Sequence, residues 1–165
     1  MIKHYFQPDE IKELINDVSI DWIKSNKIDF LILDVDNTLV IKGDNHVDEA
    51  TDKWLKECAQ YCKTVLICSN NMSHVAHDLS LKYNCFGINL ALKPFKLRLS
   101  RFIRKNNIEY TNACVIGDQL FTDIWLAKRF KYKSILVQRL NRQDYGLTKL
   151  FRGIEKMLLE KKNDK

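Results

Sequence analysis

Short apolar segments alternate along the chain with longer segments in which apolar residues recur every three or four positions. The short segments are fully apolar at their centres, as in Phe30-Leu31-Ile32-Leu33. Their length and composition are typical of strands buried on both faces of a sheet. The pattern predicts five such strands, over residues 29–35, 64–69, 86–90, 112–118 and 134–138.

The longer segments predict amphipathic helices between the strands. They cover residues 46–62, 72–83, 95–106 and 122–130, and a last helix is predicted over 147–159. One more helix is predicted to begin near Pro8, because proline is favoured in a first turn. Its apolar face would carry Ile11, Leu14, Ile15 and Val18.

The regular alternation of strand and helix predicts an α/β fold. Apolar strands joined through helices pair in parallel, and right-handed crossovers place helices on both faces of the sheet. We therefore expect a three-layer α/β/α Rossmann-like sandwich around a five-stranded parallel sheet. In such folds the reactive groups collect beyond the carboxyl ends of the strands.

The length of 165 residues fits a single domain with its own core. We expect an N-terminal helical segment (1–25), a catalytic core (29–140) and a C-terminal helix (141–165). The longest apolar runs are too short for a transmembrane helix, and the first residues lack the pattern of a secretory signal. Both features favour a cytoplasmic protein.

Cysteine and charge refine this picture only a little. The five cysteines are odd in number and lie largely in apolar segments, which is typical of reduced, buried thiols. Cys58 and Cys62 share a helix face, but no further cysteine or histidine follows at zinc-site spacing. The net charge of +6 favours anionic partners such as phosphorylated molecules, nucleic acid or an anionic lipid surface. Solvated lysine-rich helices explain that charge equally well.

Polar residues follow the predicted strands in a chemically consistent way. Asp34 and Asp36 follow the first strand, Ser69 the second, Lys93 the third and Asp118 the fourth. Carboxylates converging at one edge would repel one another unless a cation lay between them. Oxygen ligands favour Mg²⁺, while lysine and serine suit phosphate oxygens. Because a carboxylate can also act as a nucleophile, the set indicates phosphoryl transfer through an aspartyl-phosphate.

The same residues carry a family resemblance. The segment "DVDNT" (34–38) resembles the first motif, DxDxT/V, of haloacid dehalogenase-like (HAD) phosphohydrolases, and "GDQLFTD" (117–123) resembles the acidic fourth motif. Ser69 and Lys93 stand where the second and third motifs are expected. The combination "LDVDNTLV…SNN…KP…VIGDQLFTD" is similar to the YqeG branch of that superfamily, which is related to the mitochondrial phosphatidylglycerophosphate phosphatases.

The resemblance implies a role for each motif residue. Asp34 would be the nucleophile and a metal ligand. Asp36 would be the general acid and then the base, and would offer its main-chain carbonyl to the metal. Ser69 and Lys93 would bind the phosphoryl group, and Asp118 would be the remaining side-chain ligand. An aspartate at position 36 favours a phosphatase over the dehalogenase members, which lack this second acid.

Further residues are expected to support these groups. By the resemblance, Thr38 would position Asp36, and Asp123 would orient Lys93 or a metal-bound water. Asn70 is expected either to touch the substrate phosphate or to cap the next helix. His74 and His77 lie three residues apart on a helix, but they have no acidic partner at a fitting spacing and are expected to be exposed or satisfied by hydrogen bonds.

The spacing of the motifs leaves no room for a cap domain. Residues 37–68 and 72–92 each suffice for one helix and one strand, so only the loop 40–46 is expected to act as a lid. An open site suits a phosphate on a large or surface-bound substrate. We therefore expect a Mg²⁺-dependent phosphomonoester hydrolase. Its substrate could be phosphatidylglycerophosphate, a phospholipid, with peripheral contact to an anionic membrane at the inner face.

Two alternatives remain at this point. A soluble sugar or nucleotide phosphatase would share the chemistry and differ only in substrate. A nucleic-acid- or ribosome-associated binding module with a vestigial site would explain the basic charge. However, no RNA-binding aromatic signature is present and the acid set is intact, so a nucleic-acid partner is not expected. The sequence leaves the oligomeric state and partner proteins open.

Overall fold

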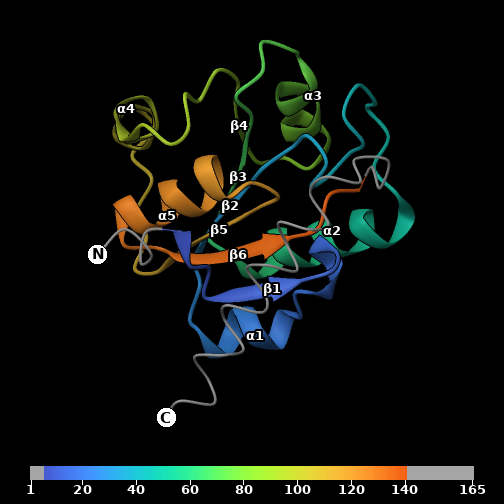
Figure 1. Ribbon diagram of the computed structural model, residues 1–165, viewed down its shortest axis with the longest axis horizontal. Coiled ribbons are helices and arrows are strands. Elements are labelled where there is room, and N and C mark those ends of the chain that lie inside the picture. The colour runs from blue at the N-terminus through green and yellow to red at the C-terminus, as the bar shows by residue number, and fades with distance from the viewer. Residues whose placement is uncertain (1–5, 141–165) are drawn as a thin grey trace.

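Parallel strands form the centre of the molecule in this computed structural model, which describes residues 6–140 (Figure 1). Across the sheet the order is β1 (Glu10–Lys12), β6 (Lys133–Val137), β5 (Ala113–Gly117), β2 (Phe30–Leu33), β3 (Thr64–Cys68) and β4 (Phe86–Ile88). Every neighbouring pair is parallel. The predicted parallel α/β architecture is confirmed. The predicted count of five strands is wrong, since the described residues contain six.

Helices cover both faces of the sheet (Figure 1). Leu31 and Leu33 of β2 pack in a core with α1 (Ile20–Ser25), α2 (Glu49–Tyr61) and α3 (Val75–Lys82). The alternating residues Phe30 and Ile32 point to the other face, where α4 (Lys96–Lys105) and α5 (Trp125–Phe130) close a second core. Successive side chains of a strand face opposite ways, so a fully apolar strand is the expected sequence for this central position.

The predicted N-terminal helix is wrong. Residues Glu10–Lys12 pair with β6 as β1, with Ile11 opposite Leu136, and a short 3₁₀ turn follows at Ile15–Asp17. The apolar spacing was compatible with a helix, but β6 would otherwise present an unpaired edge. As a strand, the segment supplies hydrogen-bond partners to the backbone of β6, which a helix over the same residues would not do. The spacing of apolar residues in the sequence does not reveal such a distant partner.

The first helix begins later than the pattern predicts. Helix α1 is capped by Ser19, whose hydroxyl accepts a hydrogen bond from the backbone N–H of Trp22 at 3.1 Å. Helix α2 is capped by Asp48 through the N–H of Thr51 at 3.0 Å. The segment predicted as a helix over 122–130 instead opens with a π-helical turn, Leu120–Ile124, which continues into α5.

The connections leave the strand ends uncovered by any further domain. Residues 37–68 contain α2 and β3, and residues 72–92 contain α3 and β4. The fold is therefore capless in the part of the chain described. None of the helices within residues 6–140 is long and apolar enough to cross a membrane. The helix predicted over 147–159, within the C-terminal segment 141–165, lies outside the described residues.

Candidate active site

Asp34 leaves the sheet directly after β2. Its backbone N–H donates to the carbonyl of Ile116 at 2.9 Å, which extends the pairing of β2 with β5 by one residue. The chain then curls back in a tight loop, with Asn37 in the left-handed region at φ 61°. Asparagine tolerates that conformation better than most residues. The loop returns the hydroxyl of Thr38 to Asp34, where it donates to Oδ2 at 3.1 Å. Thr38, expected to position Asp36, thus holds the carboxylate of Asp34 directly.

Lys93 reaches the same carboxylate from the other side. Its Nζ donates to Asp34 Oδ1 at 2.5 Å, to Asp123 Oδ1 at 2.7 Å and to the carbonyl of Cys68 at 3.0 Å. All three ammonium protons therefore have acceptors, and the side chain is only 3% exposed. Burial works to lower the pKa of Lys93, but the charges of Asp123 and Asp34 outweigh it and hold that pKa well above its usual value.

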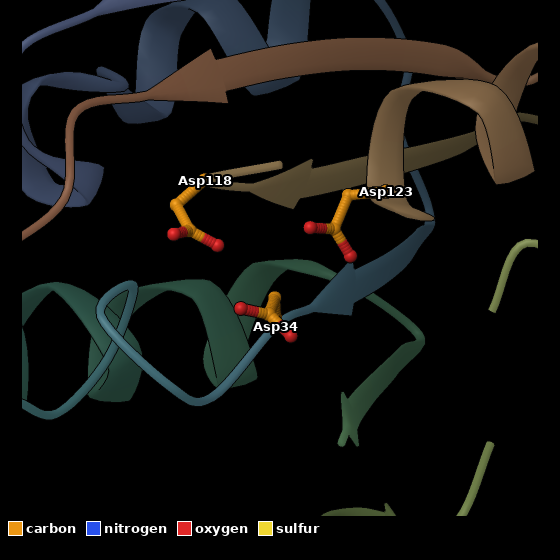
Figure 2. A group of neighbouring side chains, drawn as sticks. All are labelled: Asp34, Asp118 and Asp123. Atoms are coloured by element: carbon orange, nitrogen blue, oxygen red, sulfur yellow. The ribbon is translucent and has the colours of Figure 1, made fainter. Parts of the chain in front are cut away.

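Three carboxylates converge at the ends of β2 and β5. Figure 2 shows Asp34, Asp118 and Asp123 pointing toward one another across a shared space. One oxygen of each lies within 4.8 Å of the others, and all three residues are buried. Of the acids expected at this edge, Asp34 and Asp118 belong to the cluster and Asp36 does not. Asp123, which was expected in a supporting role, is the third member.

The π-helical turn and one glycine place Asp123 in this cluster. The turn directs the Asp123 side chain back toward β5, where its Oδ2 accepts hydrogen bonds from the N–H of Gln119 at 3.2 Å and the hydroxyl of Thr122 at 3.1 Å. Opposite lies Gly117, where a Cβ atom would come within 2.5 Å of Asp123 Oδ2. Only glycine leaves room for the carboxylate at this point.

Burial and mutual repulsion affect the protonation of the acids in this cluster. Burial, followed by the charges of Asp34 and Asp123, raises the pKa of Asp118 to about 7. Burial and the charge of Asp34 also raise the pKa of Asp123, while Lys93 opposes that shift. Buried like charges are stabilised by binding protons or a cation. The site is therefore built to gain from a positive ion.

Asp118 provides the clearest test of whether a metal fits. Both of its carboxylate oxygens are buried and accept no hydrogen bond from the described residues. Arg139 Nε lies 2.7 Å from Asp118 Oδ2, close enough for an ion pair but without the alignment of a hydrogen bond. Carboxylate oxygens that accept no hydrogen bond, next to Asp34 and with no sulfur or imidazole in the cluster of the described residues, match the oxygen ligands that Mg²⁺ prefers.

Asp36 lies beside the cluster, less buried, at the wall of an open cleft. Its Oδ2 accepts hydrogen bonds from Asn71 Nδ2 at 2.7 Å and from the hydroxyl of Ser69 at 3.3 Å. Ser69 is buried and also accepts from the backbone N–H of Asn71. Asn71 therefore orients Asp36, a contact that the sequence did not reveal because the two residues are 35 positions apart.

The side chain of Asn70 forms hydrogen bonds with the backbone of Lys93. Its Nδ2 donates to the carbonyl of Lys93 at 3.0 Å, and its Oδ1 accepts from the N–H of Lys93 at 2.7 Å. This pair of bonds ties the loop after β3 to the loop after β4. Asn70 also lines the cleft, so holding the Lys93 backbone and facing the substrate are compatible.

The cleft has a volume of about 230 Å³ and a predominantly polar wall. Asp34 and Lys93 lie in it, and Lys42 and Arg139 add positive charge from the loop 40–46 and from the segment after β6. Arg139 was missed by the sequence analysis. Since it lies two residues beyond β6, the rule that strand-end residues gather at one edge would have found it.

Other residues considered from the sequence lie apart from this site. Cys58 and Cys62 are free and buried in the core on the α2 side. His74 and His77 are exposed, and His77 lies 3.6 Å from Asp78. Within residues 6–140, none of these side chains joins the carboxylate cluster.

Comparison with known proteins identifies the family. A sequence model described as mitochondrial PGP phosphatase matches residues 3–139, which include all four motifs. The chain belongs to that family. Its similarity to "Probable phosphatase YqeG" of Bacillus subtilis (strain 168) is 30% identity over 159 residues, covering 96% of this chain and 92% of the relative. No solved structure gives a significant match.

Membership decides the class of chemistry. The protein is a HAD-type phosphatase, as the motifs indicated. The alternative of a binding module with a vestigial site is therefore not pursued. HAD phosphatases generally use Mg²⁺, and the buried aspartate cluster supplies a matching set of oxygens.

Proposed function

We propose that the protein is a Mg²⁺-dependent phosphomonoester hydrolase that works through a phosphate ester on Asp34. The observation that carries this proposal is the position of Asp34, which opens into the cleft between Lys93 and Thr38 and beside the acceptor-rich Asp118. A buried carboxylate with ordered partners on each side is held in place for attack, which lowers the entropic part of the barrier.

Binding of the phosphate group is assigned to Lys93, which lines the cleft, whereas the hydroxyl of Ser69 is buried and donates to Asp36. Lys93 donates to Asp34, to Asp123 and to the carbonyl of Cys68, and a phosphoryl oxygen in the cleft would take the place of Asp34 among these acceptors. Asp123 keeps its hold on Lys93 during this change, so the ammonium group stays directed into the cleft. Its positive charge then stabilises the charge that develops on the transferring group.

The first chemical step forms the phosphoenzyme. A carboxylate oxygen of Asp34 attacks phosphorus, and the bond from phosphorus to the substrate oxygen breaks. Asp36, protonated at this stage, donates its proton to the departing oxygen so that an alcohol leaves. Asn71 and Ser69 fix the orientation of the Asp36 carboxyl group for this transfer.

The second step returns the enzyme to its starting form. Asp36 is now a carboxylate and accepts a proton from a water molecule, whose oxygen attacks phosphorus. The bond between phosphorus and Asp34 breaks, releasing inorganic phosphate. One aspartate is thus the nucleophile and the other is the acid and then the base, and each regains its initial state.

Asp34, Asp118 and the main-chain carbonyl of Asp36 are the groups that would hold Mg²⁺. When bound, the ion would offset the carboxylate charge and would supply a Lewis acid for a phosphate oxygen. Asp123 is assigned mainly to Lys93, with which its side chain forms the shortest of its three hydrogen bonds.

The substrate proposed is phosphatidylglycerophosphate or another phosphate on a large or surface-bound molecule. The family match names PGP, and the small open cleft lacks a cap that would enclose a whole metabolite. A cleft of this kind encloses the phosphate and leaves the remainder of the substrate outside. A soluble sugar or nucleotide phosphate would share every catalytic step and differ only in what lies outside the cleft.

Hydrolysis of a chromogenic aryl phosphate with and without Mg²⁺ tests the chemistry. We expect activity that requires Mg²⁺ and falls by about a thousandfold or more in Asp34→Asn, because no other group can form the ester. Asp78→Asn, an exposed acid on α3, is the matched control. Mg²⁺-independent turnover, or full activity in Asp34→Asn, would contradict the mechanism.

A substrate panel tests the proposed specificity. Phosphate release from phosphatidylglycerophosphate in mixed micelles is compared, as kcat/KM, with release from sugar, nucleotide and peptide phosphates. Selectivity for the lipid supports the proposal. A soluble phosphate turned over as well as or better than the lipid would overturn the lipid assignment while leaving the mechanism intact.

A further inference from the structure

Large exposed apolar side chains lie on the connections that carry the cleft-lining residues. Met72 is 78% exposed, Phe95 and Phe121 are each 62% exposed, and Leu92 and Ile41 are about half exposed. We call these five residues the apolar rim. They come from the loops after β2, β3, β4 and β5, and therefore all lie at the carboxyl edge of the sheet.

Four members of the rim directly neighbour a cleft-lining residue in the chain. The pairs are Ile41 with Lys42, Met72 with Asn71, Leu92 with Lys93, and Phe121 with Thr122. In each pair one side chain faces the polar cleft and the next is exposed to solvent. On each of four separate connections, a polar residue that lines the cleft is thus followed or preceded by an exposed apolar residue. Clustered exposed apolar residues of this kind mark interaction surfaces.

Neither the backbone conformation nor the burial of Leu92 explains why this residue is a leucine. Leu92 has φ 57°, a left-handed conformation that bulky residues rarely adopt and that glycine or asparagine would adopt more easily. Its side chain is also mostly outside the core. A large apolar residue kept in an unfavourable conformation and exposed to water indicates a role in contact with something outside the chain.

Basic groups accompany the rim. The guanidinium of Arg129 lies 5.8 Å from the ring centroid of Phe95 and 5.8 Å from that of Trp125, and Lys42 is exposed beside Ile41. The exposed Arg98 follows in the first turns of α4, and the whole chain carries +6. Apolar tips beside cations are complementary to an anionic bilayer, where the tips enter the interface and the cations meet lipid phosphates.

We propose that the apolar rim is a membrane-docking surface for an anionic phospholipid bilayer, with the cleft facing the head groups. A bilayer fits this surface better than a protein because the apolar side chains stand on separate connections beside a polar cleft and are accompanied by basic residues. The orientation rests on the proposed function, since a docked rim would bring a lipid phosphate to Asp34. Membrane contact is thereby assigned to these loops rather than to the N-terminal segment, where Ile11 pairs within the sheet.

Co-sedimentation of the full chain with vesicles tests docking without reference to catalysis. The vesicles contain either phosphatidylcholine alone or phosphatidylcholine mixed with phosphatidylglycerol. We expect binding to the mixed vesicles, weakened by salt, and a partition coefficient reduced about tenfold or more in Met72→Ser/Phe95→Ser. The double variant should fold, because Met72 is exposed and serine is a favourable helix N-cap at position 95, which precedes α4.

Tyr61→Ser/Leu81→Ser is the matched control. It removes two exposed apolar side chains near the carboxyl ends of α2 and α3, at the opposite edge of the sheet. We expect its vesicle binding to equal that of the natural chain. A third variant, Leu92→Asn, suits the left-handed backbone and should weaken vesicle binding while aryl phosphate hydrolysis stays within about twofold.

Each outcome separates docking from chemistry. Failure of the natural chain to bind mixed vesicles, or equal losses in the rim and control variants, would overturn the docking surface even if aryl phosphate is hydrolysed. Vesicle binding without hydrolysis would support docking and contradict the proposed function. A rim variant that dissociates a dimer, with unchanged vesicle binding, would assign the rim to a second copy of the chain and overturn the proposal.

Discussion

A Cβ atom on Gly117 would lie 2.5 Å from Oδ2 of Asp123, so the last residue of β5 must be glycine for this acid to reach the cluster. The relationship explains why the fourth motif begins with glycine at a position with no unusual turn. Glycine is needed here because the carboxylate of Asp123 approaches it closely. Asp123 in turn accepts a hydrogen bond from Lys93 at 2.7 Å.

Gly117→Ala is the sharpest test of this relationship. We expect the methyl group to displace Asp123, which would lower kcat/KM for aryl phosphate by about tenfold or more and destabilise the fold by about 1–3 kcal/mol. Activity and urea unfolding measure the two effects. Lys53→Ala, a change at an exposed position of α2, is the control. Natural activity and stability in Gly117→Ala would contradict the assigned contact.

Replacing Lys93 should destabilise the protein as well as inactivate it. Lys93→Met keeps the side-chain length but leaves Asp34 and Asp123 without their cation. Leaving buried charges uncompensated costs about 3–5 kcal/mol of unfolding free energy. Urea titrations in the presence of a chelator measure this loss.

A double-variant cycle attributes the loss to the ion pair. Adding Asp123→Asn to Lys93→Met should recover part of the stability, because one of the two uncompensated charges is removed. Lys105→Met, an exposed lysine in the last turn of α4, should change stability by less than about 0.5 kcal/mol. The interpretation fails if Lys93→Met and Lys105→Met are equally stable.

Mg²⁺ should stabilise the folded chain through Asp118. An ion that binds only the folded state at about a hundred times its dissociation constant adds about 2.7 kcal/mol to the unfolding free energy. Thermal unfolding with Mg²⁺ or chelator measures the gain, and Asp118→Asn should remove most of it. Asp78→Asn should retain it. Equal Mg²⁺ stabilisation of the natural chain and Asp118→Asn would show that the ion binds elsewhere.

Asp9 predicts a specific pH dependence of stability. Burial works to raise the pKa of Asp9, but hydrogen bonds from Lys128 and Ser134 outweigh it and lower that pKa below 3.8. The carboxylate therefore contributes stability that is fully present above the unfolded pKa of about 3.8 and is lost as the pH falls through the lower folded pKa. We expect Asp9→Asn to cost about 1 kcal/mol at pH 7.

That cost should diminish in acid. Below about pH 3.8 the natural chain progressively loses the contribution of Asp9, whereas Asp9→Asn has nothing to lose at this position. Urea unfolding at a series of pH values compares the two chains. Glu109→Gln, a change at an exposed acid before β5, should show no such convergence. A stability difference that stayed constant down to about pH 3 would refute the assigned role of Asp9.

The central strands and their catalytic ends were predictable from the sequence for local reasons. Strand β2 is fully apolar because both of its faces are covered, and the first polar residue after it, Asp34, marks where it emerges. Parallel strands carry their carboxyl ends to one edge, so Asp34, Lys93 and Asp118 were expected to meet. Each inference needed only the hydrophobic period and the direction of the strands.

The edge strand and the π-helical turn were not predictable in the same way. The residues around Ile11 fit a helical period, but their conformation is decided by β6, more than a hundred positions away. The turn over Leu120–Ile124 differs from an ordinary helix start by one residue of hydrogen-bond spacing. Neither the pairing of β1 with β6 nor the π-helical turn leaves a local pattern in the sequence.

The sequence alone determined the class of fold, the central strands with the helices between them, and the acids expected at the carboxyl edge of the sheet. These follow from periodicity and from residue type at strand ends, which are properties of short segments. Only the tertiary structure decided which partner each acid has: Thr38 for Asp34, Asn71 for Asp36, Arg139 for Asp118, and Lys93 for both Asp34 and Asp123. Side-chain partners depend on distances between segments remote in the chain, and those distances exist only after the layers have packed.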